Sequence, residues 1–190
     1  MSSSVAQVMA EVRATDWSRF SIPAENHLWD YEASRVVPAF EQLLEVFDEE
    51  TRQRAVWALL GALGHNHSGT PSLAMVRGGE LLVEMFPYLD AWALDGVIEV
   101  LTDCYLFVAG VSDYRTADGA VHDLTVLQPV IASLRPKLSA LATSGPVEVR
   151  SSAAELARTI DEVPWVTESR GSGQARSVLG ASPGWGEDAR

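Results

Sequence analysis

The sequence predicts an all-α protein, built either as a short α-solenoid of about three antiparallel helix pairs or as an irregular helical bundle. Apolar residues recur at spacings of three and four through most of residues 36–163, which is the period of an amphipathic helix. Convincing alternation of apolar and polar residues, which would indicate strands, is hard to find. Three successive two-helix units follow one another at a spacing of roughly 40–50 residues. Such a spacing is typical of a helical solenoid.

The first predicted pair lies at 37–63. Its first helix carries one apolar stripe: Val37, Phe40, Leu43, Leu44 and Phe47. The acidic turn at 48–50 then provides an N-cap residue and a first turn in which acids are favoured. The second helix is expected to bury a stripe of its own: Val56, Leu59, Leu60 and Leu63.

The second predicted pair consists of helices at about 72–86 and 91–108, separated by a turn that Pro87 and Asp90 mark. Gly78 and the glycine after it are a weak point in the first of these helices. The second carries a long apolar stripe: Leu94, Val97, Ile98, Leu101, Tyr105 and Val108.

The third predicted pair follows a polar loop at 110–123. Apolar residues keep helical spacing over 124–141, where Pro129 and Pro136 predict an early start or a kink. Pro146 opens the last helix in its first turn. That helix presents one apolar face: Val149, Ala153, Leu156 and Ile160.

These patterns predict three parts of the chain. Residues 1–35 are expected to form an N-terminal cap segment, 36–163 the helical-repeat domain, and 164–190 a flexible C-terminal tail with linker-like composition. Large aromatic residues of the first part could cover the open end of the first pair or belong to a binding surface: Trp17, Phe20, Trp29 and Tyr31.

Composition excludes several classes of function. The 190 residues carry a formal net charge of −12, and 17 of the 26 acids lie in residues 1–114 against six arginines. Because phosphates are bound mainly through Lys and Arg, we expect no nucleic-acid and no membrane partner. A single cysteine, Cys104, permits neither an internal disulfide nor a cysteine-only zinc site. The start of the chain lacks the pattern of a signal peptide, so a cytoplasmic location is expected.

An acidic row is the first candidate site. Asp95, Glu99 and Asp103 are four residues apart, so successive carboxylates turn by only about 40° around a helix and share one face. A helical wheel places that face opposite the apolar stripe, so the row is expected to point away from the core. Glu80 and Glu84 repeat the spacing on the preceding helix. All five are candidate residues for binding a basic partner, the alternative being an ordinary solvated face.

Two stretches resemble HEAT repeats. The first is 37–63, with Arg54-Ala55-Val56-Trp57-Ala58-Leu59-Leu60-Gly61-Ala62-Leu63 as its second helix, and the other is Val149-Arg150-Ser151-Ser152-Ala153-Ala154-Glu155-Leu156. In both, an arginine precedes a small residue, as in the second helix of that repeat. The middle pair lacks this arginine. The resemblance implies a right-handed α-solenoid that binds proteins, and small acidic HEAT-like proteins of bacteria include immunity and inhibitor partners of toxins. Thirteen arginines against one lysine fit a GC-rich bacterial source.

Other chemistry is weakly supported. His65 and His67 on a glycine-flanked loop, with His122 more distant, could reach a metal or ligand, but no third ligand has a diagnostic spacing. Cys104 follows an aspartate on a predicted helix, so it is interpreted as a packing residue. No nucleophile elbow and no phosphate-binding loop occurs in the sequence. The sequence therefore predicts no cofactor and no catalytic residue, and it favours a non-enzymatic protein.

Three functions follow as hypotheses. The first is a protein-interaction module whose acidic face binds a basic partner, with an immunity or inhibitor protein as its specific version. The second is an enzyme or small-molecule binder that uses His65, His67 and His122. The third is a scaffold subunit whose apolar edge makes the contacts.

Overall fold

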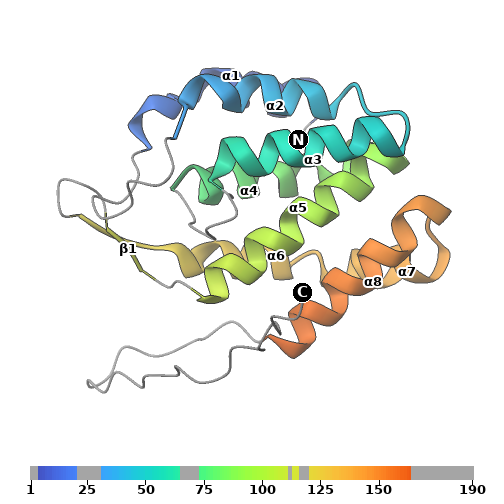
Figure 1. The fold of residues 1–190 in the computed structure, drawn as a ribbon. Helices are drawn as coiled ribbons and strands as arrows, with labels where there is room; N and C mark the ends of the chain where they lie inside the picture. Colours follow the sequence, from blue (N-terminus) through green and yellow to red (C-terminus); the bar gives the residue numbers. More distant parts are fainter. Residues whose placement is uncertain (1–3, 21–30, 65–72, 111–112, 116–119, 164–190) are drawn as a thin grey trace, which may run out of the picture.

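The computed structural model describes residues 4–20, 31–64, 73–110, 113–115 and 120–163 (Figure 1). These residues are mostly helical, so the predicted all-α class is confirmed. The α-helices are α1 (Val5–Ala14), α2 (Val36–Leu43), α3 (Glu49–Leu63), α4 (Leu73–Met85), α5 (Ala91–Gly110), α6 (Leu127–Ala132), α7 (Arg135–Ser144) and α8 (Val147–Glu162). Short 3₁₀ helices span Trp17–Arg19, Ala33–Arg35, Phe86–Tyr88 and Leu124–Val126.

Helices α2, α3, α5 and α8 follow one another from top to bottom of Figure 1. Helix α3 packs against α2 on one side and α5 on the other, and α5 packs against α8. Helices α4 and α6 contact each other and both contact α5, whereas α7 packs along α8. Helix α5 is therefore held on several sides at once, and its apolar residues from Ala93 to Tyr105 are buried.

Local signals fix the ends of α3. Asp48 caps its N-terminus by accepting a hydrogen bond of 2.9 Å from the Thr51 amide, and the Thr51 hydroxyl accepts one from the Asp48 amide, which completes a capping box. This hydrogen bonding from Thr51 lowers the pKa of Asp48. At the other end Gly64 adopts φ 108°, a left-handed conformation that favours glycine.

One hydrophobic core joins the helices, and two glycines let them approach closely. A Cβ on Gly78 would lie 2.4 Å from Cδ2 of Leu63, and one on Gly79 would lie 2.8 Å from Cδ1 of Leu127. The sequence marked Gly78 as a weak point in a helix. In the structure, both glycines allow α4 to pack directly on α3 and α6.

The N-terminal aromatics described in the structure belong to the core or pack against it. Trp17 is 4% exposed, stacks on Phe40 of α2 at 6.4 Å between ring centroids, and donates its indole N–H to the Val12 carbonyl at 2.8 Å. Phe20 and Tyr31 pack beside it, and the Tyr31 hydroxyl donates to the Trp17 carbonyl at 3.0 Å. Trp29 and the tail at 164–190 lie outside the described residues.

Three local expectations can be compared with the structure. The prolines do interrupt the long helix predicted over 124–141: the chain makes a 3₁₀ turn, then α6, then α7 with Pro136 in its first turn. The apolar stripe of the first helix was predicted too long, since α2 ends at Leu43 and Phe47 is 72% exposed. The loop at 110–123 was expected without strands, yet β1 (Asp113–Arg115) and β2 (Val121–Asp123) pair antiparallel within it.

Candidate functional site

The acidic row of α5 lies where α5 passes between α3 and α8. Asp95 is only 8% exposed, so the expectation that the whole row points away from the core is wrong at its first member. A helical wheel of α5 alone cannot show this, because α3 and α8 flank the helix and cover part of its polar side. The side chain of Glu99 is 39% exposed, and Asp103 is half-buried. The row therefore runs from a buried end to an accessible one.

Arg52 of α3 supplies the positive charge at the buried end. Its guanidinium forms ion pairs with Glu99 and with Glu49, the latter at 2.6 Å, and its Nε lies 3.2 Å from Oδ2 of Asp95. The Nε contact is an ion pair without hydrogen-bond geometry. Burial lowers the pKa of Arg52, but hydrogen bonds to Glu49 and Glu99 outweigh this and hold the pKa above its ordinary value.

Asp95 is also bound from the other side. The hydroxyl of Ser152 on α8 donates a hydrogen bond to Oδ1 of Asp95. Burial raises the pKa of Asp95 above its ordinary value, and the Ser152 hydrogen bond and the charge of Arg52 offset only part of that rise. Asp95 thus joins three helices, since Arg52 belongs to α3 and Ser152 to α8.

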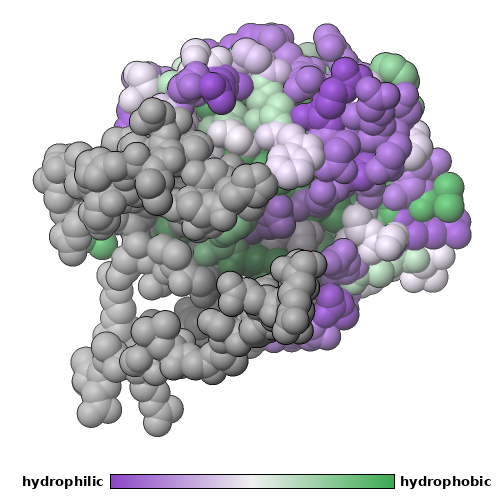
Figure 2. Space-filling view, viewed as in Figure 1, coloured by the Kyte–Doolittle hydropathy of each residue, from purple (hydrophilic) through white to green (hydrophobic). Residues whose placement is uncertain are grey.

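Beyond Asp95, helices α5 and α8 border an acidic groove of about 410 Å³. Of the residues that the structure describes, one cation, Arg52, and five carboxylates from α5 and α8 line it: Asp95, Glu99, Asp103, Glu148 and Glu155. Thr102, Ser151 and Ser152 add hydroxyl groups. We call these nine residues the acidic groove. In Figure 2 hydrophilic side chains gather on the right of this face, over the starts of α3 and α5.

Glu148 and Glu155 were missed at the level of sequence. They are seven residues apart on α8, two turns of helix, and so share the side that carries Ser152. No hydrogen bond or ion pair within the described part of the chain engages either carboxylate. The spacing alone was visible in the sequence. What could not be seen is that α8 presents this side to the acidic row of α5.

Glu80 and Glu84 form a second, separate group on α4. Arg77 pairs with Glu80 at 3.1 Å and with Glu11 of α1 at 3.1 Å. Glu84 is exposed, and its pKa is raised by partial burial and by the charges of Glu11 and Glu80, against the opposing effect of Arg77. The five candidate residues therefore fall into two clusters with different arginines, rather than one continuous surface.

The histidine candidates are only partly described. His65 and His67 lie outside the described residues. His122 is exposed on β2 and lines a hollow of about 700 Å³. Apolar residues line it too, together with Arg19, Arg77, Glu80 and Asp123. Among the residues that the structure describes, no group of three His, Cys, Asp or Glu side chains could hold a metal ion.

Cys104 is fully buried in α5, as predicted for a packing residue. Burial raises the pKa of its thiol to about 12, and the charge of Asp103 adds to the rise. Because the thiolate is the reactive form, this cysteine is a poor nucleophile in the folded protein.

Comparison of the chain with protein-family models, with curated proteins and with solved structures finds no match. The resemblance to HEAT repeats therefore rests on the residues quoted for it and stays a prediction. None of the helices in the described ranges has both the length and the apolar character needed to cross a membrane.

Proposed function

We propose that this chain is a non-enzymatic protein-binding module and that its acidic groove binds a basic segment of a partner protein. One observation carries the proposal: five carboxylates from two helices line a single groove in which Arg52 is the only cation among the described residues. Such an arrangement suits lysine and arginine side chains, because a groove lined by one sign of charge raises the local concentration of the opposite charge and speeds encounter.

The residues of the groove have two different roles in the proposal. At the inner end Arg52 and Ser152 already engage Asp95, so this end is structural and holds α3, α5 and α8 together. Glu148 and Glu155 lie on α8 about one turn before and one turn after Ser152, and neither carboxylate has a hydrogen bond or ion pair with another described residue. These two residues, with Asp103 across the groove, are the contact residues of the proposal. Glu99 has both roles, since it forms an ion pair with Arg52 and its side chain is 39% exposed.

The resemblance to HEAT repeats suggests a specific version, in which the chain is the immunity or inhibitor partner of a basic bacterial toxin. The net charge of −12 supports this version, since an acidic protein associates fastest with a basic one. The location that we propose is the bacterial cytoplasm.

A second candidate function rests on the hollow that His122 lines. Apolar side chains line it beside two arginines, Arg19 and Arg77, and two acids, Glu80 and Asp123; apolar walls with a few polar groups are the general make-up of a small-molecule site. Arg19 forms no ion pair with another described residue and lies 5.9 Å from the Phe20 ring centroid. The ligand of such a site would be a small organic acid. A thermal-shift screen of carboxylic acids distinguishes this function, because it predicts stabilisation that Arg19→Ala abolishes.

The proposed function is tested by affinity capture from a lysate of the source cells, with the wild-type chain and two matched double variants. The variant Glu148→Gln/Glu155→Gln removes two charges from the acidic groove, and the control Glu80→Gln/Glu84→Gln removes two from α4. Capture is done at about 50 mM and about 300 mM salt, between which the screening length falls from roughly 14 Å to roughly 6 Å.

The proposal predicts one stoichiometric basic protein that the wild type and the control retain at low salt. High salt and the groove variant should both release it. If no basic protein is captured at low salt, or if the groove variant captures as much as the control does, the proposal is wrong. The immunity version further requires that the captured protein arrest growth when it is expressed without this chain.

A further inference from the structure

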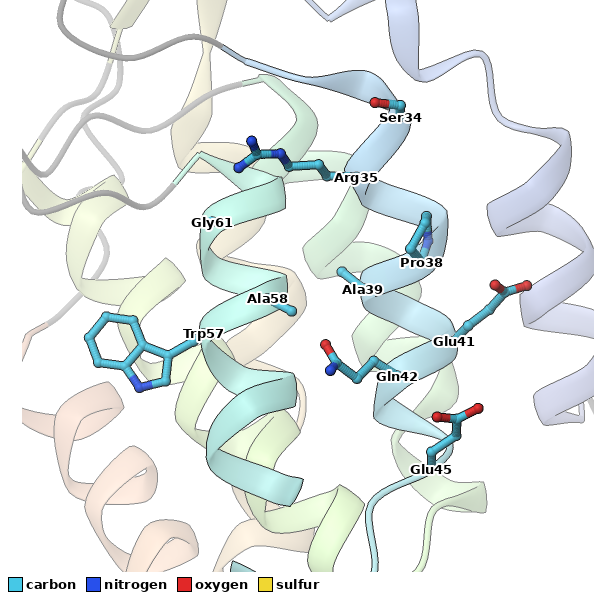
Figure 3. A pocket seen from close by; sticks show the side chains of 10 residues that line it. All are labelled: Ser34, Arg35, Pro38, Ala39, Glu41, Gln42, Glu45, Trp57, Ala58 and Gly61. Atoms are coloured by element: carbon cyan, nitrogen blue, oxygen red, sulfur yellow. The ribbon is translucent and has the colours of Figure 1, made fainter. Parts of the chain in front are cut away.

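A second surface of the molecule is formed by α2 and α3. These helices run antiparallel along a groove of about 570 Å³, with small residues on its floor: Ala39, Ala58 and Gly61 (Figure 3). No atom lies within 4 Å of the position that a Cβ on Gly61 would take. We call this surface the α2–α3 face. It lies at one end of the series of helices α3, α5 and α8.

The α2–α3 face carries the most exposed aromatic side chains of the described residues. Trp57 is 54% exposed at the edge of the groove, and Phe47 is 72% exposed in the turn between the two helices. Leu44, at the end of α2, is 41% exposed. Exposed tryptophan and phenylalanine side chains on one helix hairpin are typical of a protein–protein interface.

The charges on this face are balanced, unlike those of the acidic groove. Two arginines, Arg35 and Arg54, and two glutamates, Glu41 and Glu45, line the hollows along the two helices. Glu41 is already paired with Arg13 at 2.8 Å, and Arg35 with Glu32 at 2.6 Å. A basic partner gains little here. A partner with the same balanced charges loses little to repulsion even though the whole chain carries −12.

The order of charges makes the face complementary to itself. Figure 3 shows Arg35 at one end of α2 and Glu45 at the other, with Ala39 between them. Arg35 directly precedes α2 and Glu45 lies two residues beyond its last residue, so the whole length of the helix separates them. A two-fold axis across the middle of α2 therefore brings Arg35 of one copy opposite Glu45 of the other, twice.

The same axis is consistent with α3. It passes near Trp57 and Ala58, so that the Trp57 side chains of two copies meet at the centre of the interface. Arg54 and Gly61 lie at similar distances on either side of this point in the sequence, so the long side chain of Arg54 comes to the open space over Gly61 of the other copy. A two-fold interface requires this kind of self-complementarity, in which one patch serves both subunits.

We propose that the α2–α3 face is a homodimer interface, in which two copies of this chain pack their α2–α3 hairpins antiparallel about a two-fold axis through Trp57. The acidic groove between α5 and α8 lies away from the axis and stays open in both copies. The dimer therefore presents two acidic grooves, and its formation is independent of any basic partner.

The test is sedimentation equilibrium of the full chain from micromolar to millimolar concentration. The wild type is expected to populate a dimer. Trp57→Ala is expected to weaken it about 30-fold or more, as buried tryptophans at the centres of interfaces do. Gly61→Arg fills the space over the groove and should give a monomer. Because a Cβ there meets no atom of its own subunit and arginine favours a helix more than glycine does, the circular dichroism should stay that of the wild type and the free energy of unfolding of the monomer should not fall.

A charge exchange tests the antiparallel arrangement. Arg35→Glu and Glu45→Arg are each expected to weaken the dimer, and Arg35→Glu/Glu45→Arg is expected to restore it, since each pair is re-formed with its signs exchanged. Glu148→Gln/Glu155→Gln is the control and should dimerise as the wild type does. A monomer at every concentration overturns the proposal, and so does a dimer that Trp57→Ala and Gly61→Arg leave unchanged. Failure of the double variant to restore association overturns the antiparallel packing.

Discussion

Substitution of Arg52 by methionine tests the account of how the inner end of the acidic groove is built. Methionine keeps much of the apolar stem of arginine and removes the charge. Asp95, whose side chain is 12% exposed, is then left between Ser152 and two further acids without a cation. Breaking a buried ion pair by removing one partner costs about 3–5 kcal/mol.

The structure places the expected loss at the lower end of that range. Glu99 is 39% and Glu49 68% exposed at the side chain, so water solvates both carboxylates when Arg52 is absent. Only Asp95 loses a partner that water cannot replace, and Ser152 still donates to it. We therefore expect Arg52→Met to lower the free energy of unfolding by about 3 kcal/mol. The pKa of Asp95 should rise further, because the charge of Arg52 lowers it in the wild type.

The assay is urea denaturation at neutral pH, monitored by far-UV circular dichroism. It compares the wild type, the single variants Arg52→Met and Asp95→Asn, and the double variant. The double variant should lose less than the sum of the two single losses, with a coupling energy of about 1–3 kcal/mol. A loss below about 1 kcal/mol for Arg52→Met is what an exposed ion pair would give. It would refute the reasoning that Arg52 is the buried counter-charge of the groove.

Three further predictions follow from particular contacts. Gly78→Ala should lower the free energy of unfolding by about 1–3 kcal/mol, because its Cβ would overlap Leu63. Gly61→Ala should raise it by about 0.5–1 kcal/mol, because its Cβ meets no other atom. Denaturation of the two variants checks this contrast, and a change of the same sign in both would contradict it. Because folding raises the pKa of Asp95, the folded state keeps this proton up to a higher pH than the unfolded state does. The wild type should therefore lose stability relative to Asp95→Asn as the pH increases from the ordinary pKa of aspartate through the raised one. Denaturation across that pH interval checks this decline, and the opposite slope would be inconsistent with a raised pKa. The Cys104 thiol should not react with Ellman's reagent until the protein unfolds, and fast labelling of the native chain would show that α5 is not packed as described.

The helices were predictable because their signals are local. Asp48 and the two glutamates after it mark the start of α3, and Pro136 marks the break before α7, with no information from the rest of the chain. Phe47 shows the limit of the same reasoning. Its spacing continues the stripe of α2, but the helix ends at Leu43, so the residue leaves the buried face.

The acidic site was only half predictable. The row from Asp95 to Asp103 follows from spacing within one helix. Arg52, however, is 43 positions before Asp95 in the sequence, and no local pattern places it there. Glu148 likewise becomes part of the groove only because α8 packs against α5. A charge that a helical wheel assigns to solvent can therefore be structural once a second and a third helix are added.

The most direct test of the central claim is an NMR titration of the full chain with a short arginine-rich peptide at low salt, beside a glutamate-rich peptide of equal length. The account predicts that amide shifts change with the basic peptide alone and gather around Asp103, Glu148 and Glu155. The changes should disappear in Glu148→Gln/Glu155→Gln and persist in Glu80→Gln/Glu84→Gln. Changes that centre on Glu80 and Glu84, or that spread evenly over all exposed acids, would contradict the claim that the groove between α5 and α8 is the binding site.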